Sequence, residues 1–293
     1  MSNFARASLW MALWISCTLS MTLAGRELSK ELPVAEIMAL RSFMAALAIT
    51  PVVLWSGGAV FKTHYPGLHF TRNVAHFAAQ FFWFLAVALI PLAQVVAIEF
   101  TMPIWTALLA AALLGERLTG NRILAIALGF GGVLIILRPG VAEVSPGAFS
   151  ALAAALGFSL SVALVKKLTA SEGVLTILAH MFWTQAALSI VLIFTLASLP
   201  GDLFSWVWPS PRLYPFIALM GVVGSAGHYC LTRATSAVDA TVIGPLDFMR
   251  VPLTALMGFA LYGEPLTIYL LLGAALILAG NLMNRSSRRA AEL

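Results

Sequence analysis

The sequence predicts an all-α membrane protein in which ten transmembrane helices form two inverted five-helix repeats. Three observations support this fold class. Of the 293 residues, 61% are hydrophobic and 10% are charged, whereas soluble domains are usually about 45–50% apolar and about 25% charged. The apolar residues fall into runs long enough to cross a bilayer, which takes about 20 residues. A long apolar segment also occurs twice, about half a chain apart.

Charged residues or clusters of proline and glycine separate the apolar runs. The first run, from Ala7 to Gly25, is long for the apolar region of a signal peptide and shows no clear cleavage site, so we interpret it as the first membrane helix. The sequence IPLAQ at 90–94 predicts a tight turn between the third and fourth helices. The expected helices cover residues 7–25, 33–55, 71–90, 93–114, 121–138, 146–166, 174–198, 213–233, 238–262 and 267–284.

The distribution of Lys and Arg predicts the orientation of the chain. With the N-terminus in the cytoplasm, eleven of these residues, Arg72 among them, lie at cytoplasmic helix ends and four lie at the opposite ends. Positive residues are enriched on the cytoplasmic side of membrane proteins, so both termini are expected there. Although the net charge is +5, no basic stripe is interleaved with polar surface, and we expect no nucleic-acid partner.

The repeated segment relates the two halves of the chain. Residues 99–119, EFTMPIWTALLAAALLGERLT, match residues 247–267, DFMRVPLTALMGFALYGEPLT, at 10 of 21 positions. Two domains of five helices each are therefore expected, residues 1–140 and 141–293. An odd number of helices makes the second half enter the membrane from the opposite side. Inverted repeats of this kind are typical of secondary transporters, whose substrate site lies between the halves near the midplane.

Four charged residues stand out well inside the expected helices: Arg41, Glu99, Asp247 and Arg250. Charge inside a bilayer is costly, so each needs a partner or a function. Their depths allow an ion pair between Arg41 and Glu99, and their spacing allows one between Asp247 and Arg250. One interpretation is that these pairs only hold the bundle together. We favour the other, a central substrate cavity lined by all four residues, because Glu99 and Asp247 are equivalent in the repeat.

Polar and aromatic residues elsewhere extend the candidate substrate site. His228 and Tyr229 lie in the glycine-rich sequence GVVGSAGHYC, and Gln80 is the counterpart of His228 in the first half. We include these three as substrate-binding candidates, with ordinary interhelical hydrogen bonds as the alternative. Trp105 is a further candidate, for which exposure to lipid is the alternative.

The sequence contains no recognisable catalytic or metal-binding motif. There is no H-E-x-x-H, no Walker loop and no D-D-x-x-D pair. Cys17 and Cys230 are interpreted as small apolar residues within helices. We therefore expect no metal, no cofactor and no enzymatic activity. An intramembrane enzyme and a passive channel are the alternatives to a transporter.

Three segments carry a family resemblance: the stretch from Pro103 to Glu116, GFGGVLIILRPG at 129–140, and ALYGEPLT at 260–267. They resemble the EamA-type carriers of the drug/metabolite transporter superfamily, and the resemblance covers essentially the whole chain. It implies a multi-pass carrier of a bacterial-type cytoplasmic (inner) membrane, with ten helices, both termini in the cytoplasm and a cavity lined by both halves. The family includes exporters of amino acids and importers of S-adenosylmethionine and riboflavin. The segment 236–255 looks closer to the importers.

The predicted function is secondary transport of a small organic metabolite of the amino-acid, vitamin or nucleoside-derivative class by alternating access. The expected partners are this metabolite and the lipid bilayer. The sequence allows two kinds of carrier: an exporter of amino acids or drugs, and an importer of a cofactor-like metabolite. Proton coupling through Glu99 or Asp247 is the weaker alternative, because pairing with Arg keeps a carboxylate ionised. The protein is expected to be a monomer or a homodimer.

Overall fold

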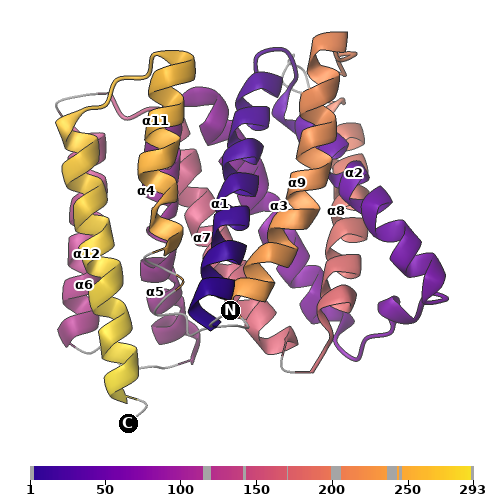
Figure 1. Ribbon diagram of the computed structural model, residues 1–293, viewed down its shortest axis with the longest axis horizontal. Coiled ribbons are helices and arrows are strands. Elements are labelled where there is room, and N and C mark those ends of the chain that lie inside the picture. Colours follow the sequence, from indigo (N-terminus) through magenta and orange to yellow (C-terminus); the bar gives the residue numbers. More distant parts are fainter. Residues whose placement is uncertain are drawn as a thin grey trace.

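The computed structural model describes residues 3–114, 120–140, 143–169, 171–198, 206–235, 243 and 246–291. Every extended element in this part of the chain is a helix (Figure 1). The elements are α1 (Asn3–Leu28), α2 (Val34–Trp55), η1 (Ala59–Phe61), α3 (Pro66–Leu89), α4 (Leu92–Glu99), α5 (Met102–Leu114), α6 (Gly120–Leu137), α7 (Pro146–Leu168), α8 (Val174–Leu196), η3 (Pro211–Leu213), α9 (Tyr214–Thr235), α11 (Arg250–Tyr262) and α12 (Ile268–Ala291).

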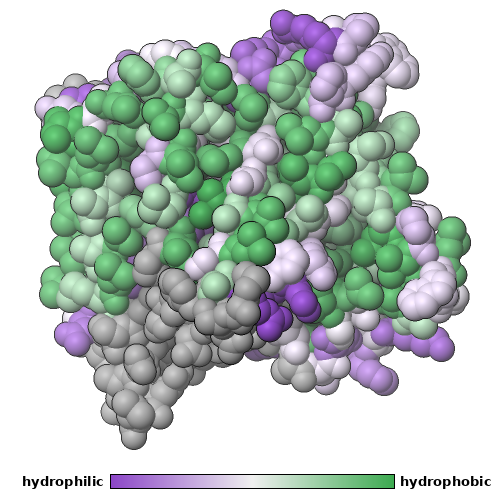
Figure 2. Space-filling model, in the orientation of Figure 1, coloured by the Kyte–Doolittle hydropathy of each residue, from purple (hydrophilic) through white to green (hydrophobic). Residues whose placement is uncertain are grey.

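The helices have the length and composition of membrane spans. Six segments are long and apolar enough to cross a bilayer, and α6 and α12 contain shorter apolar helices at Ile123–Leu137 and Ile268–Met283. Apolar side chains cover most of the face shown in Figure 2, while hydrophilic side chains gather towards its upper and lower margins. The prediction of an all-α membrane protein is confirmed.

Helices from the first and second halves of the chain pack side by side. α1 packs along α9, α3 along α7, α2 along α8 and α6 along α12. Glycines allow the closest of these contacts. A Cβ added to Gly132 of α6 would lie 2.5 Å from the carbonyl oxygen of Gly273 in α12, and the converse distance is the same. In α9, a Cβ on Gly221 would lie 2.7 Å from Cβ of Met44, so glycines of GVVGSAGHYC serve helix packing.

The fourth expected helix, residues 93–114, is interrupted rather than continuous. α4 ends at Glu99 and α5 begins at Met102. Pro103 has no N–H to donate to the carbonyl of Glu99 four residues earlier, so the helical hydrogen bonding stops there. A second interruption lies 148 residues later, because residues 246–248 are helical and α11 begins only at Arg250. Most of the ninth expected helix before this point, residues 238–242, 244 and 245, lies outside the described residues.

Side chains from neighbouring helices bind the carbonyl groups at the first interruption. Asn281 of α12 donates from Nδ2 to the carbonyl of Phe100 at 2.8 Å. Ser159 of α7 donates from Oγ to the carbonyl of Met102 at 2.9 Å. Backbone polar groups at membrane depth must find partners inside the protein. The interruption is therefore part of the packed bundle, and it leaves the carboxylate of Glu99 at a helix end inside the protein.

The third helix begins earlier than the expected residue 71. Pro66 occupies the first turn of α3, where its fixed φ and missing N–H suit a helix start. Arg72 consequently lies in the second turn, and only 6% of it is exposed. Arg72 therefore lies within the helix rather than at its end, and its side chain is buried inside the bundle.

Candidate functional site

A cavity of about 420 Å³ lies inside the bundle. Its wall combines α1, α2, α3, α7, α8 and α9 with the residues at the two helix interruptions. Cavities of roughly 300–1,000 Å³ are typical of small-molecule sites. Six of the eight predicted site residues line it: Arg41, Gln80, Glu99, His228, Asp247 and Arg250. The helix interruptions place Glu99, Asp247 and Arg250 in this wall, although they lie far apart in sequence.

Arg250 pairs with both carboxylates that line the cavity. Its Nη1 lies 3.0 Å from Oε1 of Glu99, and its Nε lies 2.9 Å from Oδ1 of Asp247. Each carboxylate also accepts a hydrogen bond from an indole N–H. Trp83 donates to Oε2 of Glu99 at 2.9 Å, and Trp14 donates to Oδ1 of Asp247 at 2.7 Å. The predicted pair between Asp247 and Arg250 is thus present, and Glu99 joins it.

The predicted ion pair between Arg41 and Glu99 is wrong. Arg41 of α2 donates from Nη1 to Oε1 of Gln80 at 2.9 Å and to Oε1 of Gln185 at 3.1 Å. Both partners are neutral amides. The expected pair of Arg41 with Glu99 was based on their similar depth in the membrane. The packing of α2 against α3 and α8 instead directs Arg41 towards the two glutamines. Arg250, from the other half of the chain, contacts Glu99.

The histidines of α3 and α9 meet in the cavity wall. The ring centroids of His76 and His228 are 5.8 Å apart. A ring nitrogen of His76, Nδ1, lies 3.3 Å from Oγ of Ser161 in α7. Among the described residues, no three His, Cys, Asp or Glu side chains are grouped so that they could hold a metal ion. The wall therefore offers hydrogen-bonding groups and aromatic faces to an organic molecule.

Two of the predicted site residues lie away from this cavity. The indole of Trp105 donates to Oγ1 of Thr101 at 3.1 Å and packs edge-on against Phe130. Tyr229 is half exposed on the outer surface of α9 and packs edge-on against Trp10. Residue type does not fix which side of a helix faces inward, and both side chains lie away from the cavity.

Sequence reasoning missed several residues of the cavity wall, among them Trp14 and Arg72. The spacing of residues in the sequence indicates both of them. In α1 the lining residues Trp14, Cys17, Thr18 and Met21 recur with helical spacing. In α3, Arg72 lies four and eight residues before the lining residues His76 and Gln80, so all three share one helix face. Recognising Pro66 as the helix start would have placed Arg72 within the span.

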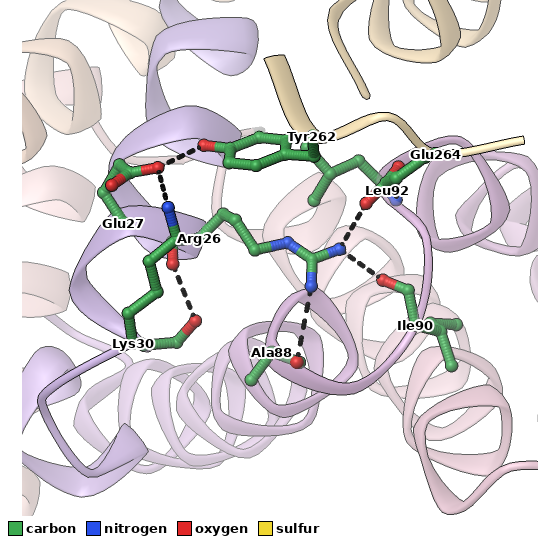
Figure 3. Close-up of polar contacts among 9 residues, drawn as sticks. Arg26, Glu27, Lys30, Ala88, Ile90, Leu92, Tyr262 and Glu264 are labelled. Atoms are coloured by element: carbon green, nitrogen blue, oxygen red, sulfur yellow. Dashed lines mark hydrogen bonds and ion pairs between the residues drawn. The ribbon is translucent and has the colours of Figure 1, made fainter. Parts of the chain in front are cut away.

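A polar cluster closes the bundle at the ends of α1, α3 and α11 (Figure 3). Arg26 donates from Nη2 to the carbonyl of Ile90 at 2.7 Å and pairs at 2.7 Å with Oε1 of Glu264. The other oxygen of Glu264 accepts the backbone N–H of Leu92, the first residue of α4, at 2.8 Å. A carboxylate is stabilised at a helix N-terminus. We call Arg26, Ile90, Leu92 and Glu264 the latch.

The latch and the chain termini lie on opposite sides of the molecule. α1 begins and α12 ends towards the lower side of Figure 1, whereas the connection from α11 to α12 lies at the upper side. The cavity includes Thr169 and Val174, which border the connection from α7 to α8. It therefore reaches the side that carries the termini, while the latch ties the helices together on the other side.

A helical membrane bundle with buried charges around a central cavity defines the class of membrane transporters. Residues 6–138 and, separately, residues 145–285 match the EamA-like transporter family. The chain belongs to this family, and it is a transporter of small metabolites.

Relatives and a solved structure agree with this assignment. The chain is 32% identical over 250 residues to a riboflavin transporter of Rhizobium johnstonii, which covers 84% of this chain and 79% of that protein. It is 25% identical over 276 residues to an S-adenosylmethionine uptake transporter of Rickettsia bellii, covering 93% and 91% of the two chains. A crystal structure matches with a TM-score of 0.64 over 99% of both chains at 21% identity, which shows a shared fold.

Proposed function

We propose that the protein imports a cofactor-like metabolite across a bacterial cytoplasmic membrane. The observation that carries this proposal is the central cavity, which extends to the side of the termini, while the latch ties helix ends together on the opposite side. The names of the relatives, riboflavin transporter and S-adenosylmethionine uptake transporter, support the substrate class and the direction. Trp14, Trp83 and Phe158 in the cavity wall offer flat apolar surface for a ring system of either kind.

The proposed mechanism is alternating access between two inverted repeats, residues 1–140 and 141–293. Three features support it: the family match occurs twice, the helix interruptions fall 148 residues apart, and α1 pairs with α9 as α3 pairs with α7. Rocking of one half against the other around a fixed site would open the latch side and close the side of the termini. Each half supplies one acid of the cavity, Glu99 and Asp247.

Glu99, Asp247 and Arg250 are proposed to bind the polar end of the substrate together with Gln80, His228 and Arg41. Because Arg250 pairs with both acids, a substrate cation or hydroxyl approaching either carboxylate competes with an internal ion pair. Such an exchange of partners links substrate binding to the contact between the halves. Proton coupling through one of the acids is a variant of this scheme.

The orientation follows from the distribution of positive residues. We propose that both termini lie in the cytoplasm, which places the cavity opening on the cytoplasmic side and the latch on the outer side. The structure then corresponds to an inward-facing state of the carrier, from which an imported substrate is released.

Uptake by cells and by proteoliposomes tests the function. Cells producing the protein are compared with cells producing a Glu99→Gln, Asp247→Asn double variant, using radiolabelled riboflavin and radiolabelled S-adenosylmethionine in separate assays. We expect saturable uptake of one of them, inhibited by the unlabelled compound and lost in the double variant. Uptake of neither compound, with normal amounts of protein in the membrane, would reject the proposal.

Counterflow in proteoliposomes separates a carrier from its alternatives. A carrier loaded inside with unlabelled substrate accumulates labelled substrate transiently, because binding and reorientation exchange the two. A passive channel shows no such accumulation, and an intramembrane enzyme converts the labelled compound into another. Faster loss of preloaded substrate from producing cells, without uptake, would show export instead.

A further inference from the structure

Two buried guanidinium groups in the cavity lack a carboxylate partner. Arg41 is 3% exposed and Arg72 is 6% exposed. Arg41 is hydrogen-bonded to two glutamine side chains, and Arg72 donates from Nη1 to Oδ1 of Asn73 at 3.0 Å. Within the part of the chain that the structure describes, neither takes part in an ion pair, in contrast to Arg250. A buried charge without a counterion is strongly unfavourable.

Hydrogen-bond donors on these two side chains are also unused. Among the residues that the structure describes, Nε of Arg41 and Nε of Arg72 are buried and have no hydrogen-bond partner, and the same holds for Nε2 of His76. All three residues line the cavity. Native proteins satisfy nearly all of their buried polar groups, so unsatisfied groups gathered in one cavity require an explanation. An arginine side chain can only donate, and the missing partner must therefore be an acceptor.

The two arginines flank His76 along one face of α3. Arg72, His76 and Gln80 are spaced by four residues each, which corresponds to a rise of about 6 Å per step. Arg41 reaches this face at Gln80. On α9, Gly224 lies beside Arg41, because a Cβ there would make ordinary contact with its Nε at 3.9 Å. Arg72 lies at one end of this face of α3 and Arg41 reaches its other end, so the two guanidinium groups lie on either side of His76.

The charges of the cavity indicate which acceptor fits. Three guanidinium groups and two carboxylates line it. Arg250 is engaged with both carboxylates, which leaves Arg41 and Arg72 uncompensated. With neutral histidines, the described lining residues together carry one positive charge in excess. A singly charged carboxylate would neutralise this excess, whereas a doubly charged phosphate monoester would reverse it. Arginine also matches the geometry of a carboxylate with two parallel hydrogen bonds.

We propose that Arg41 and Arg72, with His76 between them, form an anion subsite that binds the carboxylate of the transported metabolite. This proposal deepens the proposed function and rests on it for the statement that the ligand is transported. It assigns the protein to substrates with one carboxylate group, and the end of the substrate away from that group faces Glu99, Asp247 and the indoles of Trp14 and Trp83.

Binding of small aromatic probes to the purified full chain tests the subsite without knowledge of the substrate. Benzoate and benzamide have the same shape and differ in charge. At constant ionic strength we expect benzoate to raise the melting temperature by mass action, and benzamide to leave it unchanged. Equal shifts by the two probes in the wild-type protein would overturn the proposal, whatever the behaviour of any variant.

Variants then assign the effect to the two arginines. In Arg41→Gln and in Arg72→Gln we expect the Kd of benzoate to rise about ten-fold or more, since a charge-assisted hydrogen bond is lost. Arg212→Gln is the matched control, because Arg212 is an exposed arginine outside the cavity. Benzoate binding that survives in both cavity variants would overturn the proposal. Binding of phenyl phosphate more tightly than benzoate would overturn the assignment to a carboxylate.

Uptake assays distinguish failure of the subsite from failure of the proposed function. S-adenosylmethionine carries a carboxylate and riboflavin carries none, so we expect uptake of the former to depend on Arg41 and Arg72. If neither compound is taken up but benzoate binding depends on both arginines, the subsite stands and cofactor import fails. If uptake occurs and is unchanged in both variants, cofactor import stands and the subsite fails.

Discussion

Two arginines at similar depth in the bundle have opposite energetic roles. Arg250 contacts two carboxylates, so its charge is compensated where it lies. Arg41 contacts only the amide oxygens of Gln80 and Gln185 within the described part of the chain. Removal of one partner from a buried ion pair leaves the other charge exposed to a low dielectric, whereas removal of an uncompensated charge relieves that cost.

This difference predicts opposite effects of the same substitution. Arg250→Met leaves Glu99 and Asp247 close together without a cation, and we expect the protein to lose about 3–5 kcal/mol of stability. Arg41→Met removes a charge that has no counterion, and we expect unchanged or increased stability in the absence of ligand. Thermal unfolding of the two purified variants in the same detergent measures both effects. Similar losses of melting temperature would contradict the distinction between the two arginines.

The Arg41→Met variant also tests whether Arg41 binds a ligand. A residue that destabilises the empty protein and binds an anion is typical of a site where function opposes stability. The same substitution should therefore remove benzoate binding while the protein remains folded. The two measurements together separate a binding role of Arg41 from a purely structural role.

At the scale of helices, interruptions after Glu99 and Asp247 decide where the charged groups lie. A continuous helix would carry each acid on its surface and would direct it by helix rotation alone. The interruptions end the helix at Glu99 and one residue after Asp247, and the next segment begins with a new set of backbone donors and acceptors. Asn281 and Ser159 from two other helices bind carbonyl groups at the first interruption, so the position of Glu99 depends on α7 and α12 as well as on its own helix.

The contact between α6 and α12 depends on two facing glycines. A side chain on Gly132 would lie 2.5 Å from the carbonyl of Gly273, whereas a side chain on the neighbouring Gly131 would meet nothing within 4 Å. We therefore expect Gly132→Ala to force α6 and α12 apart and to cost about 1–3 kcal/mol. Gly131→Ala is the matched control, and it should be neutral or stabilising because alanine favours a helix over glycine.

Thermal unfolding of the two alanine variants gives the comparison directly. A lower melting temperature for Gly132→Ala and an unchanged or higher one for Gly131→Ala would confirm the close contact of the helices. Equal melting temperatures would mean that α6 and α12 can separate without cost, and that the glycines are present for another reason.

At the scale of the whole molecule, the latch ties helix ends together on the side away from the termini. Three separate parts of the chain meet there: the end of α1 with Arg26, the turn between α3 and α4, and the segment after α11 with Glu264. A Cβ on Gly258 would collide with the carboxylate of Glu264, so this glycine gives the carboxylate room to reach the N-terminus of α4. Alternating access requires these contacts to break.

Weakening the latch should expose the cavity to the latch side. In a Cys230→Ser background, Cys17 in the cavity wall is labelled with a membrane-impermeant maleimide applied to right-side-out vesicles. We expect Glu264→Gln to increase the rate of labelling about ten-fold, because a hydrogen bond involving a charged group is worth about 1.5–3 kcal/mol and its loss shifts the population of the two states.

Arg212→Gln serves as the control for this experiment. Arg212 pairs with Glu31, outside the latch, so its substitution should leave the labelling of Cys17 unchanged. Labelling that is equally slow in Glu264→Gln and in the wild-type protein would show that the latch does not control access to the cavity from this side.

The candidate site was predictable in part. The cost of charge in a bilayer pointed to Arg41, Glu99, Asp247 and Arg250, and all four line the cavity. The pairing of Arg41 with Glu99 was wrong because depth along a helix gives no information on rotation about its axis. Trp105 and Tyr229 were chosen for residue type, but their side chains lie away from the cavity.

The amino-acid sequence by itself determined the all-helical membrane class and the family. Both follow from the hydropathy of the chain, from the charged, proline and glycine residues that separate the apolar runs, and from the repeated segment. It also determined that charged groups lie at membrane depth. Only the tertiary structure decided which carboxylates Arg250 contacts, which glutamines Arg41 contacts, and that Arg26 pairs with Glu264. These contacts join residues from separate helices, and the rotation and packing of those helices depend on all their neighbours at once.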